Sequence, residues 1–118
     1  MRLTRVYIII GVALLLASCG KQYHAEQTVE DFGEANAESP EKITHRDFAD
    51  LGTTPHITDS LVSVMRQRGA AHFKQGIQYP ERPDGELYYL RMRYVHDGDT
   101  LQNTFYLDQE LKQVVAFK

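Results

Sequence analysis

Apolar and polar residues follow one another in the second half of the chain in a way that predicts an antiparallel sheet. Residues 73–79, 86–96, 100–107 and 112–117 are each predicted to be strands, because β-forming residues occupy them and turn residues separate them. The dipeptide Asp97-Gly98 between the two longest segments favours a tight type I′ turn. We therefore expect a four-stranded meander.

A two-residue turn also determines how the two long strands pair. It places His96 opposite Asp99 and, at the far end, Tyr88 opposite Leu107. A slip of one residue would mix apolar and polar side chains on both faces, so their clean separation supports this register. The apolar face, which is expected to pack on the helices, holds Tyr88, Leu90, Met92, Tyr94, Leu101, Asn103, Phe105 and Leu107.

The opposite face of the predicted hairpin is polar and is expected to meet water. We call it the open face, and it holds Tyr89, Arg91, Arg93, Gln102, Thr104 and Tyr106. Two arginines and two tyrosines on an uncovered sheet are suited to an anionic partner, a peptide or a glycan. The alternative interpretation is an ordinary solvated face.

Two helices are predicted ahead of these strands. Residues 24–38 carry one narrow stripe at helical spacing, made of Ala25, Val29, Phe32 and Asn36. A second helix is expected over residues 59–71, with Thr58 or Asp59 as its cap. Its expected inner face is Leu61, Val62, Met65 and Gly69.

The connection between the two helices is ambiguous at residues 43–51, where a short edge strand and an irregular loop both fit the pattern. The expected fold class is α+β, with two N-terminal helices packed on one face of a four-stranded antiparallel meander sheet.

The first 18 residues have the pattern of a secretory signal. Arg2 and Arg5 precede an apolar run at residues 6–17. That run is shorter than the roughly 20 residues that a membrane-spanning helix needs. The expected organisation is therefore a cleaved signal at 1–18, a lipidated tether at 19–23 and one α+β domain at 24–118.

The end of this signal resembles the bacterial lipobox, which it matches at Leu16, Ala17, Ser18 and Cys19. The resemblance implies cleavage before Cys19 and lipid on its thiol and its new amino group. Gly20 stands where an Asp would imply retention in the inner membrane. An outer-membrane lipoprotein whose domain faces the periplasm is therefore expected.

The remainder of the chain resembles small α+β domains of the cystatin-like and NTF2-like type in the order of its elements. Residues 25–32 resemble the first helix of NTF2-like lipoprotein domains. Residues 88–118 resemble the strands of small uncharacterised lipoproteins of Bacteroides-like bacteria. The inhibitory cystatin motif Q-x-V-x-G is absent, so the resemblance implies a fold and no activity.

Charge and candidate chemistry narrow the function further. The chain has 13 basic and 16 acidic residues, which indicates no nucleic-acid surface. No metal-ligand spacing is present among His24, His45, His56, His72 and His96. We therefore expect no catalysis, no metal and no cofactor.

The expected function is that of a monomeric, lipid-anchored binding protein of the cell envelope. Its anticipated contacts are the membrane, through the lipid on Cys19, and an envelope protein, peptide or glycan. The alternative is a small-ligand or enzymatic pocket between sheet and helices, near Asn103 and Tyr94.

Overall fold

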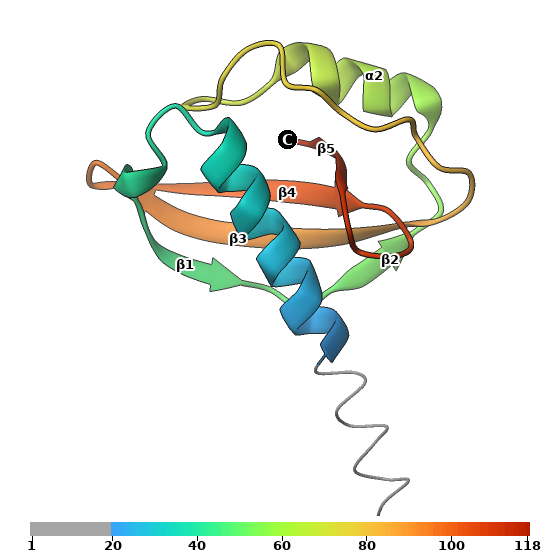
Figure 1. Cartoon of the computed structure of the whole chain (residues 1–118), viewed down its shortest axis with the longest axis horizontal. Coiled ribbons are helices and arrows are strands. Elements are labelled where there is room, and N and C mark those ends of the chain that lie inside the picture. Colours follow the sequence, from blue (N-terminus) through green and yellow to red (C-terminus); the bar gives the residue numbers. More distant parts are fainter. Residues whose placement is uncertain (1–19) are drawn as a thin grey trace, which may run out of the picture.

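Residues 20–118 are described by a computed structural model, in which helices pack against an antiparallel sheet (Figure 1). The α+β class is thus confirmed. The predicted signal, including Leu16, Ala17, Ser18 and Cys19, lies outside the described residues. The elements are an N-terminal helix described over residues 20–36, a 3-10 turn Pro40–Lys42, β1 Ile43–Phe48, β2 Gly52–Thr54, α2 Asp59–Arg68, β3 Leu87–His96, β4 Asp99–Leu107 and β5 Val114–Phe117.

The long hairpin β3–β4 has the register that its turn predicts. Pairs run from His96 with Asp99 to Tyr88 with Leu107, without a shift. The turn residues have φ angles of 50° at Asp97 and 84° at Gly98. A type I′ turn requires positive φ at both central positions, and its twist matches that of the strands it joins. This hairpin forms the centre of the sheet, whose order is β1-β3-β4-β5 with β2 also pairing with β3.

The predicted strand at residues 73–79 is wrong. Within that segment only Phe73 pairs, through an isolated bridge to Ala37. The chain cannot stay extended because Gly76 has a φ of 70°, in the left-handed region. The alternation arises from side chains that turn toward the core, not from strand pairing. Phe73 is buried, and Ile77 and Tyr79 pack against the core.

The first position in the sheet is taken by β1 and β2 instead, which settles the ambiguity at residues 43–51. Both strands run antiparallel to β3 along the same edge, and β1 contains a bulge between Thr44 and Asp47. The edge-strand interpretation is therefore confirmed, and the sheet has five strands rather than four.

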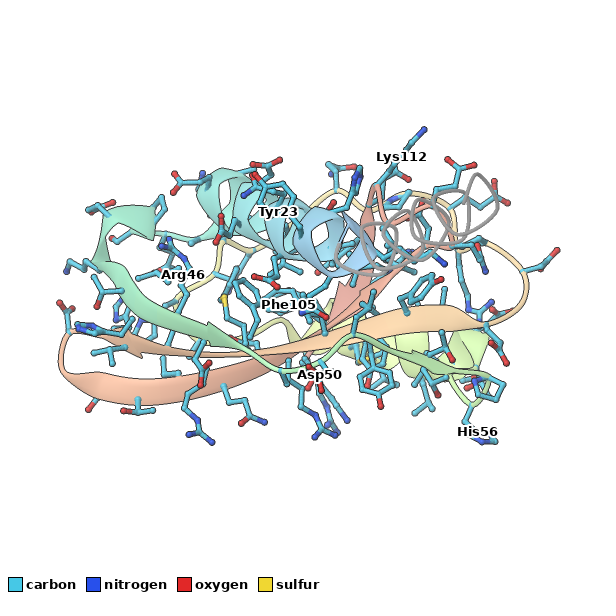
Figure 2. All side chains as sticks on the ribbon, turned by 90° about the horizontal axis from the view of Figure 1, so that it is seen from below. Tyr23, Arg46, Asp50, His56, Phe105 and Lys112 are labelled. Atoms are coloured by element: carbon cyan, nitrogen blue, oxygen red, sulfur yellow. The ribbon has the colours of Figure 1, made fainter. Side chains whose placement is uncertain are left out.

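The N-terminal helix packs on the apolar face of the hairpin, as its stripe predicts. Ala25 and Val29 are fully buried, and Phe32 packs against the same cluster. The ring of Phe32 lies 5.3 Å from that of Phe117 and 5.9 Å from that of Phe105 between centroids. Figure 2 shows Phe105 in the layer between this helix and the sheet. Residues 20–23, expected as a tether, are helical.

Helix α2 begins at its predicted cap, because the side chain of Thr58 accepts a hydrogen bond from the backbone of Leu61 at 3.2 Å. Its buried residues are Val62 and Met65. The expectation that Leu61 faces inward is wrong, since 46% of that residue is exposed. Only the part of the stripe that meets the sheet is covered.

The position of α2 differs from that of the N-terminal helix. It lies against β5 (Figure 1), and its inner residues join a second cluster with Leu87, Tyr106 and Ala116. These residues alternate along their strands with Leu90, Phe105 and the rest of the first cluster. One end of the sheet is therefore covered by α2 from the side of the open face.

A single arginine fastens α2 to two other parts of the chain. Arg66 Nε donates to the carbonyl of Val115 in β5 at 2.9 Å, and Arg66 Nη2 donates to Pro80 O at 2.8 Å. The guanidinium carbon also lies 4.9 Å from the centre of the Tyr79 ring. Together with the apolar contacts of Val62 and Met65, this side chain holds α2 against β5 and the segment at Pro80.

Candidate functional site

The open face is uncovered over the middle of the hairpin. Arg91, Arg93 and Gln102 are exposed there, and Tyr89 is half-buried. Figure 2 shows a row of nitrogen-tipped side chains that project from the sheet on the side away from the N-terminal helix. The sequence prediction of a polar, solvent-facing surface is confirmed for these positions.

The prediction is wrong for the other two members of the open face. Thr104 is 8% exposed and Tyr106 is 6% exposed, so both are buried. Tyr106 belongs to the cluster that α2 covers through Val62 and Met65. Thr104 exchanges two backbone hydrogen bonds with Lys118, at 2.8 and 3.0 Å, which brings the end of the chain alongside it.

Two shallow hollows lie on the open face, and between them they are lined by all six of its residues. The arginine hollow has a volume of about 200 Å³ and is lined by Thr54, Tyr89, Arg91, Thr104, Tyr106 and Lys118. The edge hollow has a volume of about 240 Å³ and is lined by Asp47, Phe48, Ala49, Arg91, Arg93 and Gln102. Arg91 lines both, so its side chain stands at the centre of the site.

The arginines of this site form no ion pair in the described part of the chain, although Asp47, the register partner of Arg93, lines the edge hollow. Neither Arg91 nor Arg93 forms a salt bridge or a side-chain hydrogen bond within residues 20–118. The guanidinium carbon of Arg91 lies 6.0 Å from the centre of the Tyr89 ring. A guanidinium next to an aromatic face keeps its in-plane N–H donors available for a bound anion.

Sequence reasoning missed two residues of the arginine hollow. Thr54 comes from β2, which pairs with β3, and Lys118 follows β5, which pairs with β4. Neither position has a local signal, because each reaches the hollow only through pairing with a strand distant in sequence. The face pattern of one hairpin could not find them.

Tyr89 lies in the arginine hollow because β2 has a glycine opposite it. Gly52 is the register partner of Tyr89, and a Cβ added at Gly52 would come within 2.6 Å of the Tyr89 ring. Contacts that short do not occur in folded proteins, so any other residue at this position moves the ring. The glycine thus shapes one wall of the candidate site.

The alternative pocket near Asn103 and Tyr94 is occupied by those two side chains themselves. The hydroxyl of Tyr94 donates to Asn103 Oδ1, and Asn103 Nδ2 donates to the carbonyl of Lys118 at 3.2 Å. The buried amide therefore has partners on both of its ends, as a buried polar group requires. It serves to pin the end of the chain to β4.

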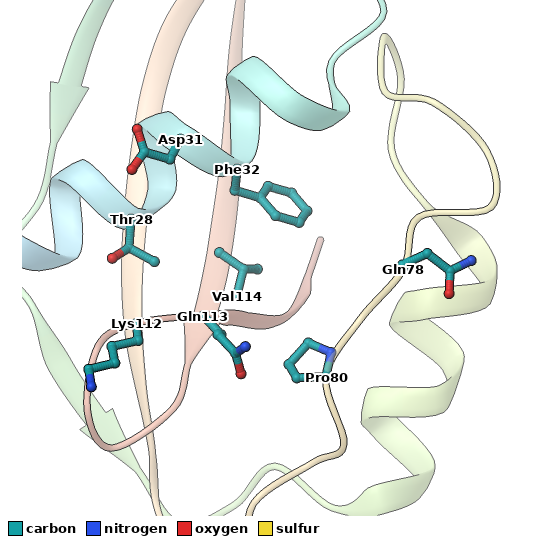
Figure 3. A pocket seen from close by; sticks show the side chains of 8 residues that line it. All are labelled: Thr28, Asp31, Phe32, Gln78, Pro80, Lys112, Gln113 and Val114. Atoms are coloured by element: carbon teal, nitrogen blue, oxygen red, sulfur yellow. The ribbon is translucent and has the colours of Figure 1, made fainter.

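A further hollow, of about 360 Å³, lies between the N-terminal helix and the segments around residues 78–80 and 112–114. In Figure 3 Phe32 and Val114 point toward its centre. The charged ends of Asp31 and Lys112 point away from it in the same view. The charged groups of this hollow are thus directed away from a bound molecule, whereas Arg91 lines both hollows of the open face.

The histidines do not assemble a metal centre within residues 20–118, where no group of three His, Cys, Asp or Glu side chains could hold an ion. His72 and His96 do meet, with their rings stacked at 3.9 Å between centroids. A stack places ring faces rather than nitrogen lone pairs toward each other.

We predict that Gly52→Val displaces the Tyr89 ring and destabilises the protein by about 1–3 kcal/mol, because the added side chain overlaps the ring. The measurement is urea unfolding, with near-ultraviolet circular dichroism to follow the tyrosines. Thr53→Val is the matched control, since Thr53 is an exposed neighbour on the same strand. Equal stability of the two variants would contradict the assigned packing.

We predict that the fold loses stability as the pH rises above 10. Burial raises the pKa of Tyr94 above its ordinary value of 10.0, and burial also raises that of Tyr79, against a smaller opposing effect of Arg66. Above pH 10 the unfolded chain therefore releases protons that the folded chain keeps, which favours unfolding.

The variant Tyr94→Phe separates the two parts of this effect. It should lower the free energy of unfolding at neutral pH by about 1–3 kcal/mol, because Asn103 Oδ1 loses its donor. It should also lose less stability than the wild type between neutral pH and about pH 11. Parallel pH profiles of the two proteins would show that Tyr94 is not responsible.

Comparison with known proteins adds no relative: no family model, no curated protein and no solved structure matches this chain. Nor does any helix in residues 20–118 have the length and hydrophobicity needed to cross a membrane. The function must therefore be argued from the chemistry of the site.

Proposed function

We propose that this protein is a lipid-anchored, non-enzymatic binding protein of the cell envelope that holds an anionic partner on the open face of its sheet. One observation carries the proposal: Arg91, without a salt bridge in the described chain, is shared by two adjoining hollows. Lys118 adds positive charge in the arginine hollow, and Arg93 adds it in the edge hollow, where Asp47 lies opposite.

The groups around Arg91 suit an anion of planar or tetrahedral shape. A guanidinium donates two parallel hydrogen bonds to a carboxylate or a phosphate, and Lys118 supplies a second positive charge in the same hollow. Thr54 and Tyr89 add hydroxyl groups to its lining. The half-buried ring of Tyr89 partly excludes water, which strengthens an ion pair formed beside it.

The anchor in this proposal is Cys19, which carries two or three acyl chains when processed as its lipobox implies. One chain binds a membrane only reversibly, whereas several make the attachment stable. Because the chain is already helical at residue 20, little slack separates the lipid from the domain. In Figure 1 this first described residue lies at the opposite end of the fold from α2.

We predict that the double variant Arg91→Glu/Arg93→Glu reduces recovery of a cross-linked partner by at least about tenfold, because it reverses the charge of the site. The measurement is a pull-down of the tagged full-length protein after cross-linking in its native cells. Arg46→Glu/Lys112→Glu is the matched control, since both residues are exposed and line neither hollow of the open face. Unchanged recovery with the first pair would contradict the proposal.

We predict that Cys19→Ser abolishes incorporation of radioactive palmitate and leaves the precursor uncleaved, because the lipobox loses the residue that is lipidated. The chain has no other cysteine, so no second thiol replaces the lost one. Gly20→Asp serves as the control, because it keeps the palmitate while moving the protein toward the inner-membrane fraction. Labelling of the serine variant would contradict the anchor.

A further inference from the structure

An apolar groove runs beneath α2 next to the open face. We call it the α2 groove; its volume is about 430 Å³. Ligand sites in proteins are commonly of this size and mostly apolar, with a few polar groups that orient the ligand. The large apolar residues of its lining are Ile57, Leu61, Val64, Met65, Tyr106 and Phe117.

Two large apolar residues of the α2 groove remain exposed to solvent. Leu61 is 46% exposed and Val64 is 41% exposed, and they lie three positions apart on the same side of α2. In the part of the chain that the structure describes, Tyr23 is the one other large apolar residue so exposed. Two such residues gathered at one groove indicate a surface that a ligand covers.

The α2 groove adjoins the arginine hollow. Tyr106 and Lys118 line both of them, so only these two side chains separate the apolar groove from the hollow that contains Arg91. Arg68 adds a further positive charge to the groove lining. No acidic residue lines either the groove or the arginine hollow. This juxtaposition calls for a ligand that is apolar at one end and negatively charged at the other.

The position of α2 favours a lipid chain over a peptide in this groove. An extended peptide on a sheet gains much of its affinity from main-chain hydrogen bonds to an edge strand. At the β5 edge the carbonyl of Val115 already accepts a hydrogen bond from Arg66, and α2 packs alongside. An alkyl chain needs no such bonds and is recognised by apolar contact alone.

We propose that the protein binds a single-chain anionic amphiphile, with its chain in the α2 groove and its carboxylate or phosphate headgroup at Arg91 and Lys118. This inference rests on the proposed function, because it assigns the headgroup to the same anion site on the open face. It adds the chemical class of the partner.

The test uses the full-length protein in native membrane vesicles, with a decanoate that carries a diazirine and an alkyne as the probe. After photolysis, mass spectrometry maps the adducts. We expect them on residues 57–70 and at the end of β5. The methyl ester of the same probe reports binding of the chain without a charged headgroup.

Val64→Asp should lower the labelling by decanoate about tenfold, because it places a carboxylate beside the chain. Val64 is an exposed helix position, so the variant keeps its fold. Tyr23→Asp is the matched control, being the same type of change at an exposed residue outside the groove, and should label like the wild type. Arg91→Gln/Lys118→Gln should lower the labelling by decanoate but not by its ester.

The outcomes distinguish the two proposals. Equal labelling of Val64→Asp and wild type, or adducts outside the groove, would overturn the amphiphile and leave the anion site standing. The anion site would be overturned if Arg91→Gln/Lys118→Gln were labelled as strongly as the wild type and the ester labelled as strongly as decanoate. The groove would then still bind an alkyl chain. Displacement of decanoate by an acidic apolar peptide, but not by lysophosphatidic acid, would overturn the lipid assignment in favour of a peptide.

Discussion

The register of the β3–β4 hairpin is the constraint on which the other parts of this molecule depend. Positive φ angles at Asp97 and Gly98 close a two-residue turn, and nine cross-strand pairs follow from it without a shift. Because side chains alternate between faces, this one register sends Phe105 toward the N-terminal helix and Arg91 toward the open face. A slip of one residue would put the arginines in the core, where a charge without a partner is strongly destabilising. The core and the candidate site are thus two consequences of the same pairing.

Helix α2 covers one end of the open face, so that an apolar groove lies next to the cationic part of the sheet. It covers Tyr106 and its neighbours from one side, and Arg66 holds it in place through bonds to Val115 and Pro80. The middle of the face stays open, and its two arginines form no salt bridge within residues 20–118. An apolar groove therefore adjoins a cationic hollow, and this contrast is the basis for an amphiphilic ligand. The first described residue, Gly20, lies at the opposite end of the fold from α2, so the proposed ligand site is remote from the start of the described chain.

Local patterns predicted the elements well where a few neighbouring residues decide the outcome. The hairpin turn, the stripe of the N-terminal helix and the Thr58 cap all depend on spacings of two to four residues. The strand expected at 73–79 failed because alternation of buried side chains does not require pairing, and Gly76 bends the chain. The expectation that Leu61 faces inward was wrong for a related reason. Helical spacing identifies an apolar stripe, but how much of the stripe is buried depends on the elements that pack against it.

From the sequence alone one can determine which residues share a face of the hairpin, and therefore that two arginines and two tyrosines belong to one surface. Only the tertiary structure decided that Thr104 and Tyr106 are covered, that Thr54 and Lys118 join Arg91, and that an apolar groove lies beside them. The physical reason is the range of the interactions. Side-chain direction along a strand follows from backbone geometry within a few residues. Burial and site composition follow from pairing and packing between segments that are far apart in the chain. Such contacts leave no pattern in the local sequence.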